Sequence, residues 1–141
     1  TCEAKGINVI LTRTTDESLG LKERIELSEK FSADLFVSLH VNSDQTDNSK
    51  SGIDCFINDS GYKKAKSFSN LLMNELKTLD GISVNGIKKS NSYILKNNSI
   101  PTVVIELGYL SNKSDFNFIN NTNNLKIISD KIVSSVLKYK D

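Results

Sequence analysis

Two ionisable residues each follow an apolar, strand-forming run, and their types and positions could support chemistry. His40 comes directly after residues 35–39, and Glu106 comes directly after residues 103–105. Burying a carboxylate among β-branched residues costs free energy unless the group is paired or has a function. An imidazole beside a carboxylate can transfer protons or bind a metal ion. The pair is therefore a candidate catalytic or metal site.

Each of the two residues also has a structural interpretation. His40 can be a histidine satisfied at the rim of the core, and Glu106 can form an ion pair with Arg13 or Arg24. A catalytic zinc usually takes three protein ligands and keeps one position open for water. His40 is the single histidine of the chain, and none of the 17 Asp and Glu residues has a spacing that selects it as a further ligand. Taken alone, the residues indicate half of a site.

The elements that must position these residues alternate between strands and helices. Runs of strand-forming residues predict strands over 7–11, 35–39, 52–57, 93–95 and 102–107. Helical spacing predicts helices over 19–31, 62–79 and 125–139, with a short helical turn capped at residues 114–115, a turn over 58–61 and an irregular stretch over 83–92.

Alternating strands and helices indicate a single α/β domain with a mostly parallel central sheet and helices on both faces. The continuous apolar run over 35–39 predicts a strand buried on both faces, and 102–107 is expected to be central. The strand over 52–57 is expected near a sheet edge. In such sheets ligands bind at the carboxyl ends of the strands, which is where His40 and Glu106 fall.

The first residues predict the end of a helix, with Lys5 in its last turn and Gly6 as its left-handed terminating residue. Short isolated helices do not persist in water. We therefore expect the natural protein to extend upstream, so that the domain over residues 1–141 is N-terminally truncated.

Composition narrows the class of protein. The chain has 141 residues, 38% hydrophobic and 25% charged, with a net charge of +1, which is typical of one globular domain. Near-neutral charge argues against nucleic acid as a partner, and no apolar run is long enough for insertion into a membrane. Cys2 and Cys55 permit a disulfide but do not predict one. No glycine-rich phosphate loop is present, which argues against a nucleotide-binding domain.

Several segments together resemble the zinc-dependent N-acetylmuramoyl-L-alanine amidases of the cell-wall autolysin type. They agree in order and spacing over nearly the whole chain: Val9-Ile10-Leu11-Thr12-Arg13 with Asp16, Leu21 and Arg24; Ala33-Asp34-Leu35-Phe36-Val37-Ser38-Leu39-His40-Val41-Asn42; Gly52-Ile53 with Phe56; Tyr93-Ile94-Leu95; and Pro101 to Asn112, which contains Glu106. One departure is Ser28-Glu29, where the family usually has Ala-Asn.

The resemblance implies an activity and a site. The activity is hydrolysis of the amide that joins N-acetylmuramic acid to L-alanine in peptidoglycan, by a zinc-activated water. A zinc held by two histidines and one glutamate would polarise the carbonyl and lower the pKa of its water. His40 corresponds to one zinc ligand and Glu106 to the catalytic residue. Asn42 and the loop over 108–112 lie where substrate could be contacted, and the alternative for each is a turn-forming role. The other zinc ligands are expected in the missing N-terminal segment, so residues 1–141 form an incomplete amidase catalytic domain, expected to be inactive alone.

The resemblance also implies partners and location. Peptidoglycan is the expected partner, and the protein is expected to act as a monomer outside the cytoplasmic membrane, in the periplasm, in the cell wall or as a secreted protein. A second hypothesis belongs to another class: a degenerate, non-catalytic amidase-like module that binds peptidoglycan or a protein partner.

Overall fold

A computed structural model describes residues 2–58 and 63–140 of the chain. The predicted turn over 58–61 lies, apart from its first residue, outside the described residues. The predicted helix start at Tyr62 also lies outside them. The strands are β1 (Phe36–Asn42), β2 (Ile53–Ile57), β3 (Val84–Lys89) and β4 (Thr102–Tyr109). The helices are α1 (Leu21–Lys30), α2 (Lys63–Leu76), α3 (Tyr93–Asn97), α4 (Lys113–Ile119) and α5 (Thr122–Lys140), and a 3-10 helix covers Glu3–Lys5.

The four strands form one mixed sheet in the order β1-β4-β2-β3. β1 pairs with β4 and β2 pairs with β3 in parallel, whereas β2 and β4 run antiparallel. The predicted single α/β domain with a mostly parallel sheet is therefore confirmed, and β4 is an interior strand as expected. β2 is also interior, so its predicted place near the edge was wrong. The reason is β3, whose polar residues around Gly86 gave no strand signal.

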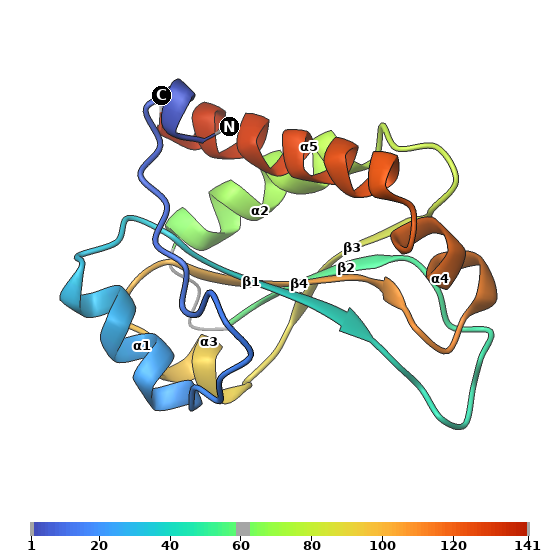
Figure 1. The fold of residues 1–141 in the computed structure, drawn as a ribbon, viewed down its shortest axis with the longest axis horizontal. Helices are drawn as coiled ribbons and strands as arrows, with labels where there is room; N and C mark the ends of the chain where they lie inside the picture. Colours follow the sequence, from blue (N-terminus) through green and yellow to red (C-terminus); the bar gives the residue numbers. More distant parts are fainter. Residues whose placement is uncertain (1, 59–62, 141) are drawn as a thin grey trace.

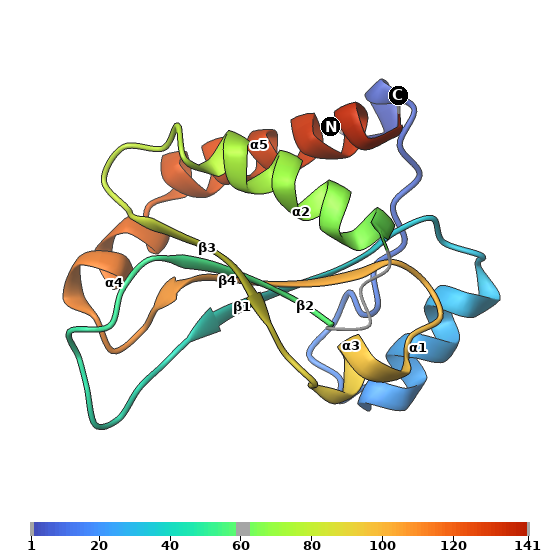
Figure 2. The ribbon, with the colours of Figure 1, turned by 180° about the vertical axis from the view of Figure 1, so that it is seen from behind.

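Helices cover both faces of the sheet, as predicted (Figures 1 and 2). α2 and α5 lie side by side over the upper face of Figure 1, and α1 and α3 lie on the lower side. The main core fills the space between the sheet and α2 and α5, with Phe68, Leu72, Leu76, Val103 and Ile105 fully buried. A smaller cluster joins α1 and α3 to the lower face, built on Ile25, Phe36, Ile94, Leu95 and Ile100.

Two strand predictions were wrong because a short apolar run does not by itself select strand over other structures. Residues 7–11 form an irregular segment with no strand pairing, and Leu11 is 63% exposed. Residues 93–97 form the helix α3, whose Ile94 and Leu95 are buried under the sheet. The predicted helix end is confirmed locally: Gly6 has φ +70°, and its N–H donates to the Glu3 carbonyl at 3.0 Å.

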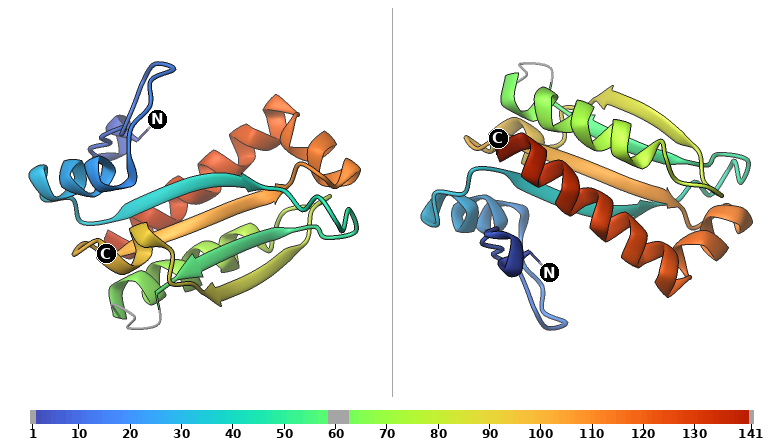
Figure 3. Two further views of the ribbon diagram at one scale, coloured as in Figure 1. Left: turned by 90° about the horizontal axis from the view of Figure 1, so that it is seen from below. Right: turned by 90° about the horizontal axis from the view of Figure 1, so that it is seen from above.

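β1 lies at the edge of the sheet, which Figure 3 shows from below and above. Within the described residues only β4 pairs with it. Leu39 is 54% exposed and Val41 is also exposed, so the prediction of a strand buried on both faces was wrong for the second half of β1. The strand begins as expected, with Phe36 buried in the lower cluster.

Candidate active site

The candidate site is a row of side chains across three neighbouring strands. In the register of the sheet, His40 on β1 is opposite Glu106 on β4, and Glu106 is opposite Asp54 on β2. Residues directly opposite in a sheet point to the same face. The two residues expected to meet, His40 and Glu106, are therefore neighbours, and Asp54 extends the row.

The imidazole of His40 is exposed on the sheet, so it is not a core histidine. Its Nε2 lies 2.8 Å from the hydroxyl of Ser38, two residues earlier on the same face of β1. Because the imidazole is exposed and its hydrogen-bond contact among the described residues is with one hydroxyl group, it remains accessible to a ligand. A metal bound through Nε2 would have to displace the hydroxyl of Ser38.

The carboxylate of Glu106 is half-buried, and its Oε2 is buried with no hydrogen-bond partner among the described residues. Neither arginine considered as its partner pairs with it. Arg13 donates to the Glu17 carbonyl at 2.9 Å, and Arg24 donates through Nε to the Leu19 carbonyl at 3.0 Å.

Burial raises the pKa of the Glu106 carboxyl. The charge of His40 acts in the opposite direction, and the carboxylate of Asp54 adds to the increase. A raised pKa and an unpartnered oxygen suit a group that accepts and returns a proton.

Asp54 and Lys88 are site residues that sequence reasoning missed. Asp54 is 0% exposed, its Oδ1 lies 2.8 Å from Nζ of Lys88, and its Oδ2 accepts from the hydroxyl of Tyr109 at 3.5 Å. Asp54 stands between Ile53 and Cys55 in a strand, and the cost of burying a carboxylate, which singled out Glu106, could have singled it out too.

A β-bulge turns Tyr109 toward this face. Opposite the two steps from His40 to Asn42 on β1, β4 takes three steps, from Glu106 to Tyr109. An extra residue in one strand reverses the side to which the following side chain points. Gly108 lies in the bulge with φ +135°, a conformation that side chains of L-residues rarely adopt.

Asp115 fixes the bulge from the first turn of α4. Its buried Oδ2 accepts from the backbone N–H of Gly52 at 2.8 Å and of Tyr109 at 2.9 Å. Sequence reasoning placed a helix cap here, and α4 does begin nearby, but the capping side chain is that of Asn112, which accepts from the backbone N–H groups of Ser114 and Asp115. Asp115 instead connects the first turn of α4 to Gly52, the residue before β2, and to Tyr109, the last residue of β4.

Asn42 lies on the same face as His40 and opposite Tyr109. Its Oδ1 accepts from the backbone N–H of Ser43 at 2.8 Å, which agrees with a turn-forming role. Contact with substrate stays a prediction for this residue.

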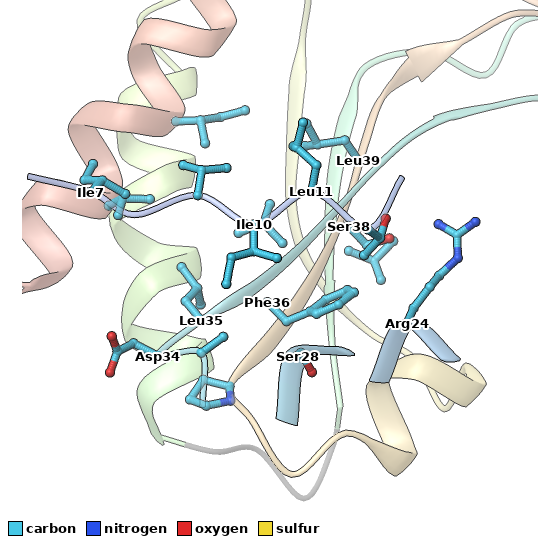
Figure 4. A pocket seen from close by; sticks show the side chains of 18 of the residues that line it. Ile7, Ile10, Leu11, Arg24, Ser28, Asp34, Leu35, Phe36, Ser38 and Leu39 are labelled. Carbon is cyan, nitrogen blue, oxygen red and sulfur yellow. The ribbon is translucent and has the colours of Figure 1, made fainter. Parts of the chain in front are cut away.

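A trough of about 1960 Å³ runs along the free edge of β1 and reaches His40 and Glu106. Figure 4 shows part of its lining, where Ile7, Ile10 and Leu11 of the N-terminal segment and Leu35, Phe36 and Leu39 of the β1 region gather. α1 and α5 contribute the other walls, including Leu21, Leu27, Ile132 and Val136. The site therefore opens at the edge of the sheet into a large space with apolar walls.

The described residues alone do not fit a three-ligand zinc site. They include no group of three His, Cys, Asp or Glu side chains placed to hold a metal ion. The thiols of Cys2 and Cys55 are free, and the second is buried in the core on the other face. His40 with its carboxylate neighbour supplies part of a donor set.

Comparison with known proteins identifies the family. Residues 2–138 match the model of the N-acetylmuramoyl-L-alanine amidase family, and the chain belongs to it. This family is generally zinc-dependent. Among the described residues, no helix combines the length and apolar character needed to cross a membrane.

The chain is similar to particular members over almost its full length. It is 30% identical to the uncharacterized protein YqiI of Bacillus subtilis (strain 168), over 97% of the chain and 66% of the relative. Among solved structures, it resembles the catalytic domain of the amidase CwlV from Bacillus (Paenibacillus) polymyxa var. colistinus, with a TM-score of 0.88 and 26% identity over 96% of this chain and 74% of that one. For an N-acetylmuramoyl-L-alanine amidase from Clostridium difficile 630 the TM-score is 0.90 and the identity 28%, over 96% of this chain and 73% of that one.

Proposed function

We propose that residues 1–141 belong to the catalytic domain of a peptidoglycan hydrolase that cleaves the amide between N-acetylmuramic acid and L-alanine in the cell wall. The observation that carries the proposal is the placement of His40 opposite Glu106 on an open sheet face, in a chain of the amidase family. Peptidoglycan is its partner, and its site of action is outside the cytoplasmic membrane.

In this proposal Glu106 is the catalytic residue. Its unpartnered Oε2 is free to accept a proton from the attacking water and to pass it to the leaving amine. Proton transfer of this kind contributes roughly 10²–10⁴-fold to a rate. We further propose that Asn42, on the same face as His40, contacts the substrate.

The proposal includes zinc as the cofactor, with His40 as one ligand. Zinc supplies Lewis-acid chemistry when it is bound in such a site. Since the described residues offer too few ligands, we propose that the others come from polypeptide outside residues 1–141. The free edge of β1 and the trough beside it support this idea, because an added strand and helix there would lie next to His40.

A non-catalytic role is the second candidate. The incomplete ligand set among the described residues favours a module that binds peptidoglycan or a protein partner without cleaving it. The two functions differ in one measurable property, which is the release of peptide from muropeptides.

The test replaces Glu106 by Gln in the natural full-length protein and measures muropeptide cleavage and zinc content. We expect cleavage to fall by at least about 10²-fold while the zinc content is unchanged, because the amide keeps the shape of the side chain but cannot accept the proton. Glu26→Gln, at an exposed position of α1 that pairs with Lys22, is the matched control. If the wild-type protein binds muropeptides without cleaving them, the second candidate replaces the first.

A further inference from the structure

The buried carboxylate of Asp54 holds a lysine at the rim of the candidate site. The Lys88 side chain is 49% exposed, while Asp54 is fully buried. Lys88 is opposite Phe56 on the neighbouring strand, so it points to the same sheet face as Asp54, two residues earlier in that strand. A half-exposed lysine is usually mobile, but this one is directed back over the sheet by the charge of Asp54.

The ammonium of Lys88 retains capacity for a second anion. A lysine carries three N–H donors, and the single partner found for it in the described residues is Oδ1 of Asp54 at 2.8 Å.

Gly86 leaves room beside this ammonium. It is opposite Asp54 in the register of the sheet, and a Cβ atom added there would meet no atom within 4 Å. Asp54 and Lys88 therefore place a half-exposed ammonium over a buried carboxylate that is the cross-strand neighbour of Glu106.

We propose that Lys88, positioned by Asp54, is a specificity-determining residue that binds a carboxylate of the substrate peptide. This inference rests on the proposed function, because the substrate is taken to be a muramoyl peptide whose amide is cleaved at Glu106.

The sheet sets the distance of that carboxylate from the reacting bond. β3 lies two strands from β4, and neighbouring strands are about 4.8 Å apart, so the two strands are separated by about 10 Å. An extended peptide advances about 3.3 Å per residue, and the Lys88 side chain reaches back toward β2. The carboxylate therefore belongs to about the second or third residue after the cleaved amide.

The experiment measures binding and cleavage of two muramoyl tripeptides by the natural full-length protein. In one peptide the carboxylates of the second and third residues are free, and in the other they are converted to primary amides of nearly the same shape. Isothermal titration calorimetry gives the affinities, and initial rates give KM and kcat. The variants are Lys88→Met and Lys88→Arg, with Lys66→Met, at an exposed position of α2 on the opposite face, as the control of equal charge change.

We expect the free acid to bind roughly 10- to 150-fold more tightly than the amide, which is the range of one charge-assisted hydrogen bond. Lys88→Met removes this preference and raises KM more than it lowers kcat. Lys88→Arg keeps most of it, and Lys66→Met leaves it unchanged. Because Lys88→Met leaves Asp54 as an uncompensated buried charge, the double variant Asp54→Asn/Lys88→Met repeats the test with both charges removed.

The outcomes distinguish failure of the proposed role of Lys88 from failure of the proposed hydrolysis. The role of Lys88 is overturned, even if cleavage is observed, if the wild-type protein binds both peptides with equal affinity. It is also overturned if the preference for the free acid survives in Lys88→Met and in the double variant. A preference abolished by Lys66→Met as strongly as by Lys88→Met also overturns it, because overall charge would then explain the effect. A carboxylate preference that depends on Lys88, without cleavage of either peptide, supports the binding role and refutes the proposed hydrolysis.

Discussion

Removing the carboxylate of Asp115 is expected to loosen the candidate site and destabilise the fold. Its Oδ2 accepts two backbone hydrogen bonds, from Gly52 at 2.8 Å and Tyr109 at 2.9 Å, and the residue is buried. In Asp115→Ala both N–H groups lose their partner. A buried donor left unsatisfied costs about 1–3 kcal/mol, so the free energy of unfolding should fall by about 2–6 kcal/mol.

Asp115→Asn separates hydrogen bonding from charge. One amide oxygen placed where Oδ2 lies can accept both N–H groups, and the substitution also removes the cost of burying a charge. We therefore expect Asn to cost only about 1 kcal/mol, which is the charge-assisted part of the two bonds. Asp130→Ala is the control, since Asp130 is exposed and pairs with Lys126 one helical turn away, an interaction of about 0.5 kcal/mol or less.

Urea denaturation measures these differences. With a slope of about 2 kcal/mol per M, Asp115→Ala should lower the midpoint by about 1–3 M. Hydrogen exchange at the amides of Gly52 and Tyr109 should accelerate in the same variant, because these are the groups released. The reasoning is refuted if Asp115→Ala costs no more than Asp130→Ala, or if Asp115→Asn is as damaging as Asp115→Ala.

Two further predictions concern metal binding and alkaline stability. Residues 1–141 alone should hold zinc weakly, and His40→Ala should change their metal content little; tight stoichiometric zinc by metal analysis would contradict the proposed ligand set. Burial raises the pKa of the Cys55 thiol from 9.0 to about 11, so the native state holds its proton more tightly than the unfolded chain. Stability is then complete below about pH 9 and should fall by about 1.4 kcal/mol per pH unit between about 9 and 11. Urea midpoints at pH 8 and 10.5 should therefore drop further in the wild type than in Cys55→Ala, and parallel drops would contradict the assignment.

The sequence predicted the helices and strands whose apolar residues recur at a regular spacing, and the site residues that follow an apolar strand. The long helices α2 and α5 and the central strand β4 follow directly from the spacing of apolar residues such as Phe68, Leu72 and Ile105, which are all fully buried. His40 and Glu106 were expected to meet because each follows a strand, and the parallel register of β1 and β4 places them opposite each other.

The rest depended on tertiary contacts that local pattern does not carry. β3 is polar and contains Gly86, so only its pairing with β2 makes it a strand. The apolar run over 93–95 is too short to show a helical or a strand period. Residues 93–97 form a helix because Ile94 and Leu95 pack against α1 under the sheet. Asp115 was missed as a site residue since one of its partners, the N–H of Gly52, lies far away in sequence.

The largest difference between the predicted and the observed fold lies at β1, and it bears on the proposed function. The run over 35–39 has the pattern of a strand covered on both faces, yet Leu39 is exposed and the outer edge of β1 is unpaired within the described residues. The incomplete set of metal ligands lies at this same edge, around His40. A strand and helix from outside residues 1–141, bound in the trough, would cover Leu39 and bring ligands to His40 at once. Glu106 and Asp54 lie on interior strands paired on both sides, so their positions do not depend on that event. The proposal therefore divides the site into a preformed half, which carries the proton transfer and the carboxylate contact, and an edge half, which is completed when β1 is covered.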